Sequence, residues 1–150
     1  MATFTFSNLK YFLGIEVAQS KDDIFIYQKK YVLDLLKKTR MLGGRPYNIA
    51  LEADQKLSED QRGDPVDRGR YQRLVGKFIY LSHSHPDIVI AVNMVSQFMH
   101  APRNSHLEAV MRILRYLKAS LGKGLYFSKH GHFSVEAFID VDWARSVTDR

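Results

Sequence analysis

Cysteine is absent from this 150-residue sequence, which excludes disulfide bonds and thiolate metal sites. No uninterrupted apolar run reaches the roughly 18 residues that a membrane span needs, and the first residues lack the basic start of a secretory signal. The sequence also contains no glycine-rich phosphate loop, no Gly-x-Ser-x-Gly turn and no metalloprotease helix motif. We therefore expect an intracellular protein, cytoplasmic or nuclear, that contacts no membrane and uses none of these catalytic motifs.

The composition is that of a folded domain with a basic character. Hydrophobic residues make up 45% of the chain and charged residues 25%, which is enough apolar material for one core. The formal net charge is +6, and acidic side chains concentrate in residues 51–70, between two basic parts. Clustered lysine and arginine attract phosphate backbones, but a similar excess occurs in proteins that bind no nucleic acid. Charge alone leaves nucleic-acid binding open.

The N-terminal part predicts a β-hairpin over residues 9–27. Residues 10–17 and 24–27 are rich in β-branched and aromatic side chains, and they flank a polar turn. Gly14 lies inside the first predicted strand. Glycine weakens a strand there unless the strand bulges or another backbone approaches it closely, and both explanations remain open.

Four helices are predicted, over about residues 28–42, 67–82, 86–99 and 105–120. The third is apolar on most sides, so we expect it to be central and buried. Ser105 and Glu108 have the spacing of a capping box, which predicts the start of the fourth helix.

Two of these helices carry basic strips. On the first helix, the strip opposite the apolar stripe contains Lys29, Lys30, Lys37 and Lys38. The second strip runs over residues 103–129 and includes Arg112 and Arg115, with Glu108 as its one acidic residue. Each strip suits a phosphate backbone, and each is also compatible with a solvated surface.

The C-terminal part predicts a second hairpin, with strands over residues 125–128 and 133–139. Asp140 and Asp142 follow two residues apart, so on an extended chain their carboxylates share one face. Two carboxylates give at best a weak metal site, because a hydrolytic two-metal centre needs more ligands. Paired histidines at positions 83, 85, 130 and 132 fall in predicted turns without converging ligands, and we interpret them as surface or capping residues.

Eight short motifs are spread along nearly the whole chain. They are LKYFLGIEV (9–17), YQRLVGKFIYL (71–81), PD (86–87), SQFM (96–99), HLEA (106–109), RYLK (115–118), GKGL (122–125) and DVDWA (140–144). In order and spacing they resemble the Pol polyproteins of copia-type LTR retrotransposons. Residues 47–51 depart from that family's Thr-Pro-containing pattern.

The resemblance implies the distal part of a reverse transcriptase in residues 1–129 and the start of a ribonuclease H domain in residues 130–150. Phe12, Leu13 and Gly14 match the primer-grip hairpin, which favours a close backbone approach at Gly14. The helix with the first basic strip then begins the thumb. Asp140 matches the first metal-binding aspartate of ribonuclease H, as a vestigial catalytic position. The expected fold is α+β: an N-terminal hairpin, a thumb-like bundle of about four helices, and a C-terminal hairpin that begins a ribonuclease H-like sheet.

The function implied by the resemblance is to hold a template–primer duplex during RNA-directed DNA synthesis. The expected partner is an RNA–DNA or DNA duplex, bound without sequence preference, and the oligomeric state stays open. The family polymerises DNA and cleaves RNA with Mg²⁺, but this chain has no Tyr-x-Asp-Asp motif and lacks most ribonuclease H carboxylates. We therefore expect no activity, and no cofactor, for the chain alone. Two alternatives remain: a domesticated, non-catalytic nucleic-acid-binding module, and a helical protein-interaction domain whose basic faces are only solvated.

Overall fold

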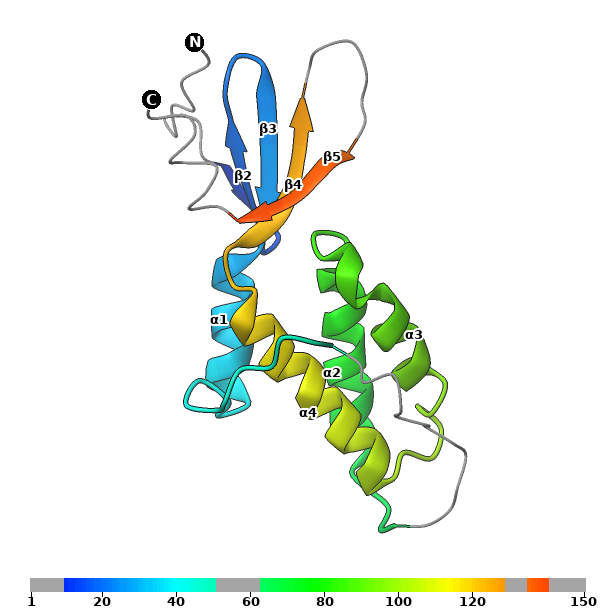
Figure 1. Cartoon of the computed structure of the whole chain (residues 1–150). Coiled ribbons are helices and arrows are strands. Elements are labelled where there is room, and N and C mark those ends of the chain that lie inside the picture. Colours follow the sequence, from blue (N-terminus) through cyan, green and yellow to red (C-terminus); the bar gives the residue numbers. More distant parts are fainter. Residues whose placement is uncertain (1–9, 51–62, 129–134, 141–150) are drawn as a thin grey trace. The chain divides into compact units, whose positions relative to one another are not determined.

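The computed structural model describes residues 10–50, 63–128 and 135–140 (Figure 1). The chain forms two compact units. One, which we call the sheet unit, consists of Met1–Thr39 with Ser120–Arg150, and the other, the helical unit, is Arg40–Ala119. The expected mixed α+β class is confirmed. The expected domain boundary near residue 129 stays a prediction.

The described residues of the sheet unit form five antiparallel strands in the order β1-β2-β3-β4-β5. Their bounds are Lys10–Phe12, Ile15–Gln19, Asp23–Tyr27, Lys123–Ser128 and Val135–Asp140. We expected two separate hairpins, and this is corrected by the pairing of β3 with β4, which joins them into one sheet. The pairing satisfies the backbone groups along one side of β3 that a lone hairpin leaves unpaired.

The core of the sheet unit follows the period of two along β3. Phe25 and Tyr27 point to the same face and are buried together with Ala18, and Tyr126 of β4 packs against them. The rings of Phe25 and Tyr27 lie 5.3 Å apart between centroids. Gly124 lies opposite Tyr27, and a Cβ there would collide with the carbonyl of Ile26 and the side chain of Tyr27. Only glycine lets β4 approach β3 so closely at this point.

The first helix, α1 (Lys29–Lys38), is shorter than the predicted 28–42. It buries Val32, Leu35 and Leu36 on one stripe, as the sequence pattern predicted. The hydroxyl of Thr39 donates a 2.8 Å hydrogen bond to the carbonyl of Leu35, and the next residue, Arg40, has a φ of +58°. A left-handed residue cannot continue the helix, so α1 ends here.

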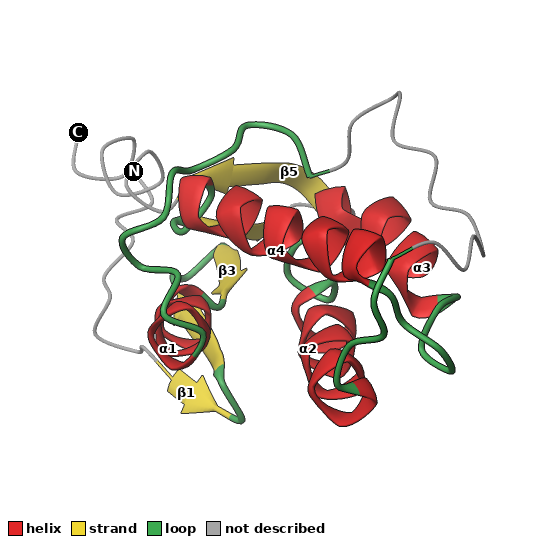
Figure 2. Ribbon diagram, turned by 90° about the horizontal axis from the view of Figure 1, so that it is seen from below, coloured by secondary structure: helices red, strands yellow, loops and turns green. Residues whose placement is uncertain are grey.

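The helical unit is built from α2 (Arg68–Leu81), the 3₁₀ turn η2 (Pro86–Ile88), α3 (Val89–Ser96) and α4 (Asn104–Ala119). The helices α2, α3 and α4 all contact one another (Figure 2). We expected the third helix to be central and buried; it packs against both α2 and α4, but it is buried on one face only. It buries Ala91, Val92 and Val95, but Ile90 is 72% exposed, because only one face of this short helix lies on its neighbours.

The start of α4 also differs from the prediction. The helix begins at Asn104, and the backbone N–H of Arg103 donates a 2.9 Å hydrogen bond to Nδ1 of His106. His106 is buried, and its ring stacks on Phe98 with 4.0 Å between centroids. A histidine at the third helical position therefore has the role that the capping-box pattern assigned to Glu108, two residues further on.

Candidate nucleic-acid interface

The basic strip of α1 lies on the exposed side of that helix. Lys30, Lys37 and Lys38 are exposed, whereas Lys29, at the first turn, is partly buried. Helical geometry puts Lys30, Lys37 and Lys38 on one face, together with the exposed Asp34. From Lys30 to Lys38 the helix rises about 12 Å. Along this distance α1 presents three lysines and one acidic side chain.

The segment at Leu13 and Gly14 is a tight turn and not part of a strand. Phe12 pairs with Ile15 across it, and Leu13 and Gly14 have φ values of +51° and +84°. A two-residue hairpin turn with both φ values positive matches the right-handed twist of the flanking strands, and such turns favour glycine. The expected strand through residues 10–17 is therefore corrected to two strands, β1 and β2, and the bulge explanation of Gly14 is wrong.

This turn lies against α1. A Cβ on the buried Gly14 would come within 2.7 Å of Cδ2 of Tyr31, and the carboxylate of Glu16 accepts a 3.1 Å hydrogen bond from the backbone N–H of Lys30. Leu13, at the tip of the turn, is 72% exposed. The structure thus brings together Leu13, Gly14 and the start of the basic helix. The side chain of Phe12 lies outside the described part of the chain.

The second strip has a different setting, in the helical unit. Arg112 and Arg115 of α4 both lie over the ring of Tyr47, with Cζ atoms 5.6 and 5.4 Å from its centroid. Nη1 of Arg115 donates a 3.4 Å hydrogen bond to the hydroxyl of Tyr47, and the backbone N–H of Tyr47 donates to the carbonyl of Arg115 at 3.2 Å. Lys118 Nζ donates to the carbonyl of Gly44. These contacts hold the segment after α1 on the basic strip of α4.

Tyr47 was missed by the sequence reasoning. It lies in an irregular segment with glycine and proline nearby, so no helical or strand period connects it with α4. Its only signal is an aromatic residue within a basic, polar stretch that ends before the acidic middle of the chain.

The predicted carboxylate site stays a prediction. Asp140 is the last residue of β5, and Asp142 lies outside the described residues. Within the parts of the chain that the structure describes, no three His, Asp or Glu side chains come together as metal ligands. His83 is exposed, with its Nδ1 2.9 Å from the carbonyl of Tyr80. His85 is buried near Asp87. His83 and His85 therefore do not form a pair of metal ligands. The histidines at 130 and 132 lie outside the described residues.

None of the helices in the described ranges is both long and apolar enough to cross a membrane.

Comparison with known proteins finds relatives among retrotransposon polyproteins and a plant mitochondrial protein. The chain is 39% identical to the retrovirus-related Pol polyprotein from transposon RE1 of Arabidopsis thaliana, over 94% of its own length. It is 36% identical to the corresponding polyprotein from transposon RE2 of the same plant, over 95% of its length. An uncharacterized mitochondrial protein of Arabidopsis thaliana is 34% identical over 99% of the chain. The chain spans 10% of the length of either polyprotein and 63% of the mitochondrial protein.

No protein-family model matches the chain, and no solved structure matches it significantly.

Proposed function

The chain belongs to the family of copia-type retrotransposon Pol polyproteins, of which it corresponds to one segment, and from this premise we propose that it holds a template–primer duplex during RNA-directed DNA synthesis. The primer backbone passes the turn of Leu13 and Gly14, and the phosphates of the duplex lie along Lys30, Lys37 and Lys38. Contacts of this kind are made to the backbone, so the duplex is bound without sequence preference.

The observation that carries the proposal is the packing of the turn on α1. Tyr31 leaves no room for a Cβ at position 14, and the bond from Lys30 to Glu16 ties the N-terminus of the helix to β2. These contacts hold the exposed tip of the turn next to the helix that carries the row of lysines. The lysine row extends over about 12 Å, and a duplex presents one phosphate charge per roughly 1.7 Å of its axis, so several phosphates fall within reach.

We also propose that the chain alone does not catalyse either reaction of the family. Two-metal phosphoryl chemistry needs several carboxylates that hold ions about 4 Å apart. Of the candidate ligands, Asp140 and Asp142 bind at best one Mg²⁺ weakly, and the sequence has no Tyr-x-Asp-Asp motif. Duplex binding by the lysines needs no metal.

The test is a titration of the chain with a labelled RNA–DNA hybrid at several salt concentrations, in the presence of Mg²⁺. If about four phosphates are neutralised, affinity falls roughly a hundredfold between about 50 and 200 mM salt. Replacing Lys30, Lys37 and Lys38 together by glutamine lowers the slope of log affinity against log salt by about three, because each phosphate contact contributes about 0.9. The recovered hybrid is expected to be intact.

A charge-matched control removes three cations elsewhere, by replacing Lys21, Arg73 and Lys77 with glutamine. We expect this variant to keep most of the slope, since loss of net charge alone acts weakly at high ionic strength. Equal slopes in the two variants would contradict the proposed interface. No binding by the parent chain would also contradict it and would favour the protein-interaction alternative. Hybrid cleavage that Asp140→Asn abolishes would contradict the proposed inactivity.

A further inference from the structure

A hollow of about 410 Å³ lies in the helical unit along one face of α4. It is lined by Tyr47, Asn104, Leu107, Glu108, Met111, Arg112 and Arg115. Six of these residues lie on α4, each with a partner three or four positions away, so they form a stripe about 16 Å long on one face of the helix. Tyr47, from the segment that packs on α4, forms the remaining wall. Volumes of several hundred cubic ångströms are typical of ligand sites.

The two ends of this groove differ in chemistry. At one end, Arg112 and Arg115 are held over the ring of Tyr47, and Tyr47 is itself fixed by its backbone bond to Arg115. The Nε of Arg115 is buried and finds no acceptor among the described residues, and Nη1 of the same guanidinium donates to the hydroxyl of Tyr47. Two neighbouring guanidiniums held in place in this way suit an anion with several acceptor oxygens, such as a phosphate.

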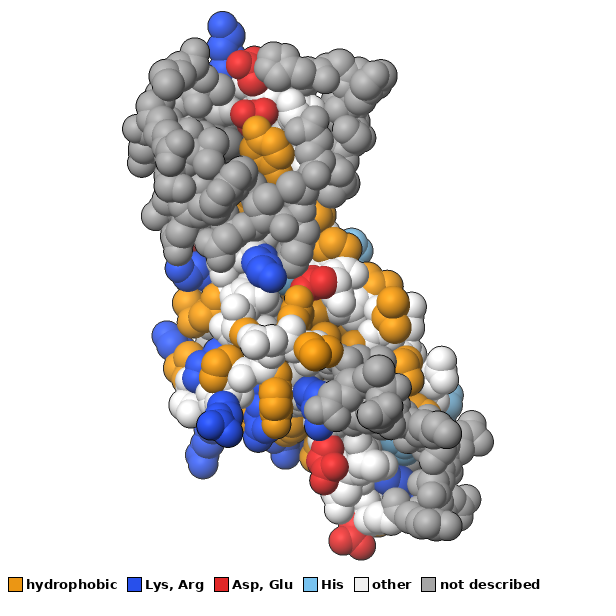
Figure 3. Space-filling model, viewed as in Figure 1, with side chains coloured by type: hydrophobic (Ala, Val, Ile, Leu, Met, Phe, Trp, Pro, Cys, Tyr) orange, Lys and Arg blue, Asp and Glu red, His pale blue; other side chains and the backbone are white. Residues whose placement is uncertain are grey.

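The middle and the far end offer contacts of another kind. Leu107 and Met111 are partly exposed and form an apolar floor, with the carboxylate of Glu108 between them along the helix and the amide of Asn104 at the far end. On the face shown in Figure 3, apolar and basic side chains lie next to each other over this unit. The apolar floor offers a phosphate no hydrogen-bond donor, but it can pack against the flat face of a base.

We propose that this groove binds single-stranded nucleic acid, with a phosphate at Arg112 and Arg115, a base over Leu107 and Met111, and the edge of that base near Asn104 and Glu108. A duplex is the poorer occupant, because its bases are stacked and offer no face to the apolar floor. The inference rests on the proposed function in so far as the ligand is a nucleic acid. It differs from the proposed function in two ways: the ligand is single-stranded, and the residues that bind it lie in the helical unit.

The test compares a labelled thymidine oligonucleotide of about eight nucleotides with a duplex of the same length, both bound to the full chain. Arg115→Gln is expected to weaken single-strand binding about tenfold and to lower its salt slope by about 0.7, the contribution of one phosphate on a single strand. Met111→Gln, which keeps the length of the side chain and makes it polar, is expected to weaken single-strand binding severalfold with an unchanged salt slope. Neither change should alter duplex affinity by more than about twofold.

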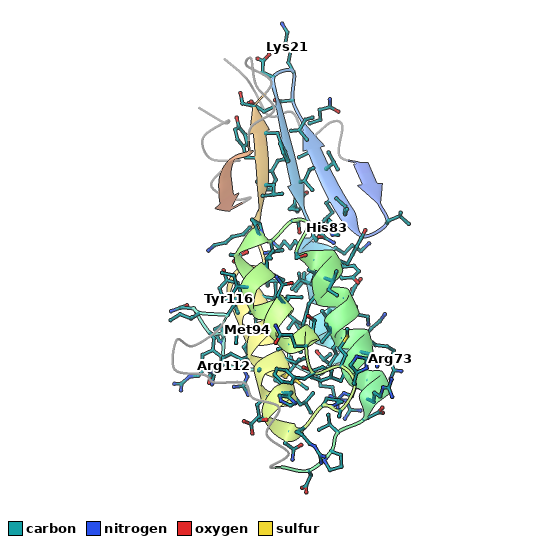
Figure 4. All side chains as sticks on the ribbon, turned by 90° about the vertical axis from the view of Figure 1, so that its right-hand side faces the viewer. Lys21, Arg73, His83, Met94, Arg112 and Tyr116 are labelled. Carbon is teal, nitrogen blue, oxygen red and sulfur yellow. The ribbon has the colours of Figure 1, made fainter. Side chains whose placement is uncertain are left out.

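The matched control is Arg73→Gln, which removes one positive charge from an exposed arginine of α2. Figure 4 shows Arg73 and Arg112 on opposite sides of the helical unit. If Arg115→Gln weakens single-strand binding no more than Arg73→Gln does, the groove is not the site. If Met111→Gln does not change single-strand affinity, no base packs on the floor and the proposal fails. This result decides the proposal even if Arg115→Gln is poorly folded.

The same experiment separates this inference from the proposed function. The triple glutamine variant at Lys30, Lys37 and Lys38 is expected to lose duplex binding and to keep single-strand binding. Loss of both kinds of binding in Arg115→Gln would show one shared track for nucleic acid and would overturn the separate groove. Binding of an acidic peptide that competes with the oligonucleotide would show a site for anions of any kind, and would overturn the assignment to nucleic acid.

Discussion

Tyr71 of α2 is fully buried, and its hydroxyl donates a 2.6 Å hydrogen bond to the carbonyl of Val95 in α3. Burial raises the pKa of Tyr71, because the phenolate would have to exist without water around it. The folded chain therefore keeps this phenol protonated at a pH where an unfolded chain would already ionise it. The hydrogen bond joins two helices of the helical unit through a single neutral donor.

Replacing Tyr71 by phenylalanine removes this donor and is expected to lower the free energy of unfolding by about 1 kcal/mol near pH 8. Because the folded-state pKa is raised, the stability linked to the protonated phenol is fully present below the unfolded value of about 10 and is lost as pH rises above it. The difference between the parent chain and Tyr71→Phe should therefore shrink by about 0.8 kcal/mol between pH 8 and about pH 10.5. Urea unfolding at both pH values measures this, and a constant or growing difference would contradict it.

Individual site residues could be predicted from the sequence only where they belong to a regular pattern. Lys30, Lys37 and Lys38 are exposed on one helix face, as their spacing indicated. The two positive φ values at Leu13 and Gly14 were not predictable, because the flanking residues continue a strand pattern through the turn. Tyr47 was not predictable either, since its partners on α4 lie more than sixty residues further along the chain.

At the scale of elements, the helices follow from amphipathic spacing and the strands from alternation, and errors concentrate at the ends. α1 stops at Lys38, because Arg40 adopts a left-handed conformation that no local pattern announces. α4 starts at Asn104, because buried His106 accepts a hydrogen bond from the backbone N–H of Arg103, where the capping-box pattern predicted one from Ser105 to Glu108. End positions depend on such single side-chain and backbone choices, whereas the body of a helix depends on the sum of many residues.

The contact between the β1–β2 turn and α1 is tested by Gly14→Ala. The added methyl group is expected to destabilise the chain by about 1–3 kcal/mol, because φ is +84° and the new carbon would lie 2.7 Å from Tyr31. The same change should weaken duplex binding, since the turn must move off α1. Gly43→Ala is the control, because nothing lies within 4 Å of its Cβ position. Thermal unfolding and the hybrid titration measure both effects, and equal behaviour of the two variants would contradict the packing argument.

At the scale of the whole molecule, the long-range pairing is what local patterns could not supply. The sequence predicted a hairpin near each end of the chain, but the pairing of β3 with β4 joins segments about a hundred residues apart. Both hairpins have an open edge, and nothing in their own residues says which edge is covered. The groove on α4 could not be predicted from local patterns either, because its second wall is Tyr47, which is distant from α4 in the sequence. The family, in contrast, was predictable from the order of short motifs, and the relatives bear it out.

The most direct measurement of the central claim is the chemical reactivity of individual lysines with and without a bound RNA–DNA hybrid. The chain is acetylated at low salt and each lysine is quantified by mass spectrometry. If the duplex lies along α1, Lys30, Lys37 and Lys38 lose reactivity severalfold, whereas Lys21 and Lys77 keep theirs, because a phosphate backbone shields only the amines that it contacts. Unchanged reactivity on α1, or an equal loss at all five lysines, would contradict the account.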